Sequence, residues 1–175
     1  NMKIDTEITS QIPVDYTFIT GKSNINCSYF IDKIEEGIGS EDNRSFQTNL
    51  KSYMTSWDFF INDTNFHNFL LPILDKIDSY PNVPPYYLQS AWGLKENFSH
   101  RTTVHNHESC FMSGVLYLNN HLQVLNFPKV KKTVKPEKNK FVIFSSFLDH
   151  YAERNKTTKS KYAIAFNLGY QLNYK

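Results

Sequence analysis

Apolar residues recur along the chain at two different spacings, and the change falls near Pro81. Before that point the spacing is helical. A first helix is expected over residues 24–38, where it buries Phe30, Ile31, Ile34 and Ile38. Asp63 or Thr64 can cap a second helix, in which Pro72 predicts either a kink or a late start. The apolar stripe of this second helix contains Phe66, Phe69, Leu70, Ile73, Leu74 and Ile77.

After Pro84-Pro85 the pattern changes to short segments rich in Val, Ile, Tyr and Phe, which favour strands. Asn119-Asn120 predicts a hairpin turn, and the basic stretch 129–140 predicts a solvated loop. Shorter strands are also expected within residues 1–20 and near residues 50–54. The main strands are predicted at residues 86–94, 102–107, 111–118, 122–127, 141–145 and 161–170.

This order of elements predicts an α+β protein that is mainly β. The strands would form a two-sheet sandwich or jelly roll, with the N-terminal helices packed against one sheet. We expect a single domain over residues 1–175. Residues 1–80 would supply helical support and outer strands, and residues 86–170 would form the core.

Composition narrows the class of protein. The chain has 175 residues, of which 40% are hydrophobic and 15% aromatic, which is typical of a folded globular domain. A net charge of +2 does not indicate a nucleic-acid binder. No apolar run approaches the ~20 residues that cross a bilayer, and no signal-peptide pattern is visible. We therefore expect a cytoplasmic protein in which Cys27 and Cys110 are reduced.

The candidate chemistry centres on three histidines. His105 and His107 lie two apart in a predicted strand, so their side chains would share one face. His150 follows a later strand that a jelly roll could bring alongside, which favours a metal site over three unrelated histidines. Cys110 is close enough in sequence to be a ligand, although simple burial of a free thiol is the favoured interpretation.

The last predicted strand has two different faces. Tyr162, Ile164 and Phe166 form an apolar face suited to the space between the sheet and its packing partner. The opposite face carries Lys161, Ala163, Ala165 and Asn167. Two small residues there leave room for a ligand, and the lysine could neutralise a ligand carboxylate. An ordinary solvent-facing strand explains the same pattern equally well.

Six pieces of the sequence occur in an order that is informative as a set. They are HNHES at 105–109, SGVLYL at 113–118, FP at 127–128, FVIFSSFLDH at 141–150, Asn155, and KYAIAFN at 161–167. This order resembles the small 2-oxoglutarate/iron(II)-dependent oxygenases of marine bacteria and their phages. The resemblance covers residues 86 to 170 and implies a double-stranded β-helix, cupin-like, with a metal site in its core.

The resemblance also implies roles for individual residues. His105 and His150 would bind Fe(II), and the third ligand would be His107, where such enzymes usually place a carboxylate. Glu108 is the weaker alternative, because it needs a bulge to reach the same face. Lys161 stands where the family commonly has an arginine that pairs with the far carboxylate of 2-oxoglutarate.

Three further residues complete the implied pocket. Tyr117 could donate its hydroxyl to the same carboxylate, while Trp92 and Asn167 could line the walls. The implied activity is a dioxygenase that uses Fe(II), 2-oxoglutarate and O2 to hydroxylate an unidentified substrate. If a phage encodes the chain, it would work in the host cytoplasm.

Two alternatives stay open at this point. A cupin-type metal protein would use the same three histidines without 2-oxoglutarate, although the glutamate that cupins carry after the second histidine is absent. A non-catalytic jelly-roll binding module would use neither metal nor co-substrate, and the many tyrosines and asparagines would suit sugar binding. The sequence identifies neither the primary substrate nor the oligomeric state.

Overall fold

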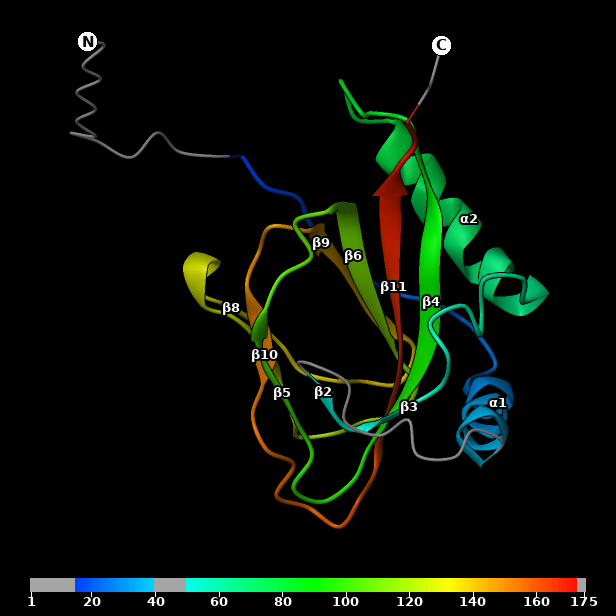
Figure 1. The fold of residues 1–175 in the computed structure, drawn as a ribbon, viewed down its shortest axis with the longest axis vertical. Coiled ribbons are helices and arrows are strands. Elements are labelled where there is room, and N and C mark those ends of the chain that lie inside the picture. Colours follow the sequence, from blue (N-terminus) through cyan, green and yellow to red (C-terminus); the bar gives the residue numbers. More distant parts are fainter. Residues whose placement is uncertain (1–14, 40–49, 173–175) are drawn as a thin grey trace, which may run out of the picture.

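A computed structural model describes residues 15–39 and 50–172 of the chain. In these ranges, two antiparallel sheets form the body of the molecule, and two helices lie along one side of it (Figure 1). The larger sheet runs β1 (Phe18–Lys22), β9 (Lys140–Ser145), β6 (Cys110–Tyr117), β11 (Lys161–Tyr170), β4 (Tyr86–Glu96) and β3 (Tyr53–Met54). The smaller sheet runs β2 (Leu50–Lys51), β5 (Arg101–His105), β10 (His150–Ala152), β7 (Leu125–Phe127) and β8 (Lys132–Val134).

The two predicted helices are present as α1 (Cys27–Gly39) and α2 (Thr64–Asp78). The side chain of Asp63 caps α2 by accepting a hydrogen bond from the backbone N–H of Phe66 at 2.8 Å. The helix continues through Pro72, so the predicted alternative of a late start was wrong. The apolar stripes of both helices are buried together against the larger sheet.

Strand β11 has the predicted bounds and separates two cores. Ile164 and Phe166 are fully buried in the cluster that contains the helices. Ala163 and Ala165 belong to two other clusters, on the side that faces the smaller sheet. Any side chain at Gly114 of the neighbouring strand would clash with the ring of Phe166, so the close approach of these two strands requires glycine there.

The predicted hairpin at Asn119-Asn120 was wrong, because the strands on either side of it belong to different sheets. The Asn119 side chain instead donates to the carbonyl oxygen of Ser160 at 2.9 Å and accepts from the N–H of Tyr162 at 3.0 Å. These hydrogen bonds anchor the segment that connects the two sheets to the start of β11.

Two other expectations also need correction. The stretch 129–140 is not a simple solvated loop, since it contains part of a 3-10 helix (Pro128–Val130) and β8, whose Val134 is buried. The predicted strand 122–127 shrinks to the three residues of β7. Strands of three residues carry too few positions for an alternating pattern to reveal them, and the same applies to the unpredicted β10.

The remaining outer strands agree with expectation where they are described. β1 falls at the end of the predicted 1–20 region, of which residues 1–14 lie outside the described part, and β2 with β3 matches the strand near 50–54.

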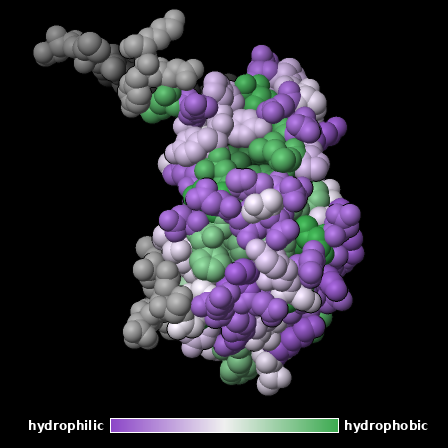
Figure 2. All heavy atoms as spheres, turned by 90° about the vertical axis from the view of Figure 1, so that its right-hand side faces the viewer, coloured by the Kyte–Doolittle hydropathy of each residue, from purple (hydrophilic) through white to green (hydrophobic). Residues whose placement is uncertain are grey.

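Seen from the side that carries the helices, the surface mixes hydrophilic areas with smaller apolar patches (Figure 2). No helix in the described ranges is long and apolar enough to span a membrane. The mainly β, two-sheet jelly roll with supporting helices is confirmed.

Candidate metal centre and ligand pocket

The three predicted histidines meet between the two sheets. One ring nitrogen from each of His105, His107 and His150 lies within 4.8 Å of the other two. His105 ends β5 and His150 begins β10, and these two residues face each other in the pairing of the strands. In the part of the chain that the structure describes, this is the one group of three or more potential ligands that could hold a metal ion.

His107 reaches the cluster by a different route from the one predicted. β5 ends at His105, so His107 lies in the turn that follows and does not share a strand face with it. The turn is fixed because the N–H of His107 donates to the carbonyl oxygen of Ser146 at 2.8 Å. In addition, the side chain of Asn106 donates to Asp149 at 2.8 Å. These contacts tie the turn to the segment that leads into His150.

Hydrogen bonds to backbone carbonyls set the tautomers of two of the rings. Nδ1 of His105 lies 2.8 Å from the carbonyl oxygen of Thr103, and Nδ1 of His150 lies 3.0 Å from that of Leu148. A carbonyl oxygen can only accept, so Nδ1 carries the proton in each ring. Nε2 of both rings is left with a free lone pair, which is the arrangement that a metal ligand requires.

Burial keeps all three imidazoles neutral. It lowers the pKa of His105, and it lowers the pKa of His107 to about 4 with a further contribution from the charge of His105. The pKa of His150 falls to about 3, again mainly because of burial. Three neutral nitrogen donors suit a divalent mid-row transition metal, because proton competition for the ligands is weak near pH 7.

These shifts predict how the stability of the metal-free protein depends on pH. The pKa values of the three histidines are lower in the folded than in the unfolded state, so the unfolded chain binds more protons below about pH 6.5. The free energy of unfolding should therefore fall as pH drops from 7.5 to 5. Urea unfolding in EDTA measures this loss. His150→Gln should show a smaller loss, and equal losses in the two proteins would contradict the assignment.

Glu108 and Cys110 lie outside the histidine cluster. Glu108 is exposed on the turn, and it is not among the side chains that could share a metal ion. Cys110 is buried, and its thiol donates to the side chain of Gln89 at 3.5 Å. The predicted use of Glu108 in place of His107 thus finds no support in the geometry.

Glu108→Ala is accordingly expected to leave metal binding unchanged, because the carboxylate has no place among the three rings. Titration of the metal-free variant with Fe(II) or Co(II) under anaerobic conditions measures this affinity. His107→Ala is the matched comparison and should weaken binding strongly. A loss of affinity in Glu108→Ala that equals the loss in His107→Ala would show that the turn rearranges around the metal.

A cavity of about 100 Å³ extends from the histidines between the sheets. The floor of the cavity is formed by residues that lie side by side on neighbouring strands of the larger sheet. Ala165 on β11 is paired with Trp92 on β4 and with Val115 on β6. The next row places Ala163 between Leu94 and Tyr117. The small side chains of the central strand leave this space open, and the larger flanking side chains form its walls.

The far end of the cavity is charged and buried. Nζ of Lys161 lies 3.1 Å from Oε2 of Glu96, and both side chains are almost fully excluded from solvent, at 6% and 2% exposed. The hydroxyl of Thr102 donates to the other carboxylate oxygen at 3.2 Å. Tyr117 lies at the same end, and burial together with the charge of Glu96 raises its pKa. Its hydroxyl is therefore protonated and can donate.

Sequence reasoning missed Glu96, which the predicted strand 86–94 excluded. The strand extends to Glu96, and the antiparallel register then places Glu96 directly opposite Lys161. The alternation of Trp92, Leu94 and Glu96 puts all three on the pocket face. This alternation was the available signal, but it becomes informative only once the register between the two strands is known.

Trp92 and Asn167 line the cavity as expected, but they differ in what they can still bind. The side chain of Asn167 accepts a hydrogen bond from Ser113 at 2.7 Å and donates one to Ser90 at 3.1 Å, so its amide is already hydrogen-bonded to residues of the cavity wall. Trp92 is 3% exposed, and its buried Nε1 has no hydrogen-bond partner. A buried donor of this kind is costly unless an acceptor arrives. Trp57, which sequence reasoning also missed, packs on Trp92 with ring centroids 4.5 Å apart.

Comparison with solved structures places this arrangement in context. The fold resembles the viral collagen prolyl hydroxylase vCPH of Paramecium Bursaria Chlorella virus-1 in its 2-oxoglutarate complex, with a TM-score of 0.69 and 14% identity over 87% of this chain and 94% of that chain. HygX of Streptomyces hygroscopicus with nickel and 2-oxoglutarate gives 0.67 and 12% identity, over 89% and 83%. A Pseudomonas putida prolyl-4-hydroxylase gives 0.67 and 13% identity, over 89% and 93%.

The chain has the fold of 2-oxoglutarate-dependent oxygenases. No protein-family model matches its sequence, and no curated protein does so either. At 10% to 14% identity the likeness to the solved structures establishes the oxygenase fold and leaves the activity to be argued from the site. The narrower grouping with marine bacterial and phage proteins stays a prediction.

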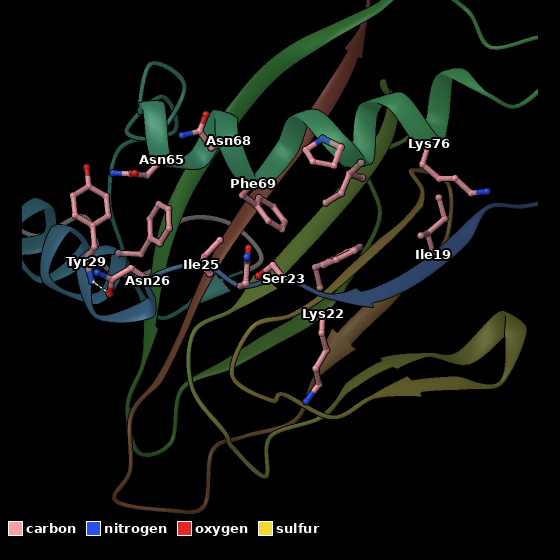
Figure 3. Close-up of a pocket in the computed structure, with 15 residues that line it drawn as sticks. Ile19, Lys22, Ser23, Ile25, Asn26, Tyr29, Asn65, Asn68, Phe69 and Lys76 are labelled. Atoms are coloured by element: carbon pink, nitrogen blue, oxygen red, sulfur yellow. Dashed lines mark hydrogen bonds between the residues drawn. The ribbon is translucent and has the colours of Figure 1, made fainter.

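The oxygenase fold carries a second and larger groove of about 720 Å³, between α1, α2 and β1 (Figure 3). Phe69 and Phe141 are among its lining residues, and both pack in the core beneath the helices. The next residue along β9, Val142, belongs instead to the cluster on the cavity side. The groove and the histidines therefore lie on opposite faces of the larger sheet, and the groove cannot share a ligand with the metal centre.

Proposed function

We propose that the protein is an Fe(II)- and 2-oxoglutarate-dependent dioxygenase that hydroxylates an unidentified substrate. The observation that carries this proposal is the layout of one cavity. Three neutral imidazoles occupy one part of it, and a buried lysine lies at its far end. The fold that it shares with 2-oxoglutarate-dependent oxygenases supports the same conclusion.

The donor set fits ferrous iron. His105, His107 and His150 would hold the ion and leave coordination positions for other ligands. Three neutral donors do not reduce the charge of the ion, which favours an anionic keto acid as the next ligand. Bound Fe(II) would supply the activation of O2 that couples oxidative decarboxylation of 2-oxoglutarate to hydroxylation.

The remainder of the cavity fits the co-substrate. Apolar side chains line much of the space between the metal centre and Lys161, and a charge interaction made in such surroundings is stronger than in water. Lys161 would pair with the far carboxylate, and Tyr117 would donate its hydroxyl to it. Nε1 of Trp92 has no hydrogen-bond partner, so it is a further donor in the wall that could bind an oxygen atom of the ligand.

A spectroscopic titration tests the proposal. Adding 2-oxoglutarate to the anaerobic Fe(II) protein should produce the weak visible charge-transfer band of a chelated keto acid, and admitting O2 should release succinate. The metal-free protein is the control and should show neither signal. Tight Fe(II) binding without a band or succinate would contradict the proposal.

A cupin-type metal protein that needs no 2-oxoglutarate is the second candidate. One observation favours it, because Lys161 already has a carboxylate partner in Glu96 and has no unmet need for an anion. The titration above separates the two candidates. A cupin would bind the metal and give no band with the keto acid.

A further inference from the structure

The buried pair at the far end of the cavity has an unusual charge balance. Lys161 and Glu96 lie 3.1 Å apart with almost no solvent access, so their charges cancel. A ligand carboxylate that reaches Lys161 would therefore meet a site of zero net charge. The resulting cluster of one cation and two anions would carry a buried negative charge, which is strongly unfavourable away from water.

Among the residues that the structure describes, no second cation pairs with Glu96 to offset that charge. Tyr117 on β6 contributes a neutral hydroxyl, and Thr102 on β5 donates a hydrogen bond to Oε1. His121, in the connection after β6, has its pKa lowered, first by burial and then also by the positive charge of Lys161. Nδ1 of this ring accepts a hydrogen bond from the backbone N–H of Gln123 at 3.0 Å, so it carries no proton and the ring is neutral near pH 7. Within residues 15–39 and 50–172, Lys161 is thus the one charged side chain that forms an ion pair with Glu96.

The geometry also prevents Glu96 from leaving. It is 1% exposed; its Oε1 accepts a hydrogen bond from Thr102, and its Oε2 has no hydrogen bond and only the ion pair with Lys161. The side chain of Asn155 additionally donates to its backbone carbonyl at 3.2 Å. The available response to an incoming anion is therefore a change of protonation state, since moving this side chain into water would open the buried end of the cavity.

We propose that Glu96 makes binding of a dicarboxylate keto acid proton-coupled: one proton from solvent enters the Lys161–Glu96 pair when the far carboxylate of the ligand arrives. The protonated Glu96 then has an O–H that can donate to an anion, and Lys161 is free to pair with the ligand. Glu96 is a specificity-determining residue in this scheme. It penalises dicarboxylates at high pH and has no such effect on keto acids with an uncharged tail.

This inference rests on the proposed function, and calorimetry of ligand binding tests it without turnover. The Ni(II)-loaded protein is titrated at pH 7.5 with 2-oxoglutarate in two buffers that differ in heat of ionisation. The difference in binding enthalpy gives the number of protons taken up. 2-Oxopentanoate is the matched ligand, because it has the same five-carbon chain and keto acid group but no second carboxylate. Subtracting its value removes any proton change at the metal.

The wild-type protein should take up about one more proton with 2-oxoglutarate than with 2-oxopentanoate. In Glu96→Gln the excess should disappear, and 2-oxoglutarate should bind roughly tenfold to a hundredfold more tightly at pH 7.5. Gln keeps an oxygen that accepts from Thr102, so the local wall is preserved. The wild-type measurement stands by itself if the variant does not fold.

Two results would overturn the inference in distinguishable ways. Binding of 2-oxoglutarate with no excess proton uptake would show that the pair accepts a second carboxylate unchanged, and the proposed function would survive. Failure of both keto acids to bind the Ni(II)-loaded protein would overturn the proposed function, and the proton coupling with it.

Discussion

His150→Ala should abolish retention of iron. The substitution leaves two imidazoles from one short segment, His105 and His107, and removes the one ligand that comes from the other strand. Losing only the hydrogen-bond partner of a metal ligand typically weakens binding roughly 10- to 100-fold, so losing a ligand should cost more. Iron per protein after desalting, measured by a ferrozine assay, should fall from near stoichiometric to background.

The control for this experiment is His67→Ala on α2, since His67 is exposed and does not belong to the cluster. It should retain iron as the wild type does. Circular dichroism and an unfolding curve of metal-free His150→Ala establish that the fold persists. A folded His150→Ala protein with undiminished iron would remove His150 from the site and leave the oxygenase proposal without a metal centre.

The convergence of the histidines could be anticipated because the order of motifs around them resembles that of a known oxygenase family. A pair of histidines two residues apart and a later one near a strand end fit the way jelly rolls bring distant strands together. The two faces of the last strand could also be predicted, since the small residues Ala163 and Ala165 alternate with the larger Ile164 and Phe166. Local periodicity therefore assigned the faces of β11, but the shared strand face predicted for His105 and His107 was wrong, because His107 reaches the site from a turn.

The features that escaped prediction depend on pairings between distant segments. The ion pair between Glu96 and Lys161 exists only because the register of β4 against β11 sets them opposite each other. No local pattern encodes that register. The false hairpin at Asn119-Asn120 has the same origin, because a polar turn sequence is equally consistent with a crossing between sheets.

Lys161→Met should destabilise the metal-free protein by about 3–5 kcal/mol. The substitution removes the cation that is paired with the buried Glu96 carboxylate, and breaking a buried pair from one side leaves an uncompensated charge. Urea unfolding at pH 7.5 measures the loss. An exposed pair on α1 is the matched control: Lys33 and Glu36 lie 3.4 Å apart, and Lys33→Met should cost at most about 1 kcal/mol.

The double substitution Lys161→Met with Glu96→Gln separates charge from packing. It removes both charges together, so most of the stability lost in Lys161→Met should return, although the protein still lacks the cation for 2-oxoglutarate. Iron should stay bound in both proteins, since the three imidazoles are unchanged, while the affinity for 2-oxoglutarate should be lost in both. Equal instability of the single and double variants would mean that Lys161 acts through packing. The charge argument for Glu96 would then fail, because it requires that the carboxylate is ionised while the pair is intact.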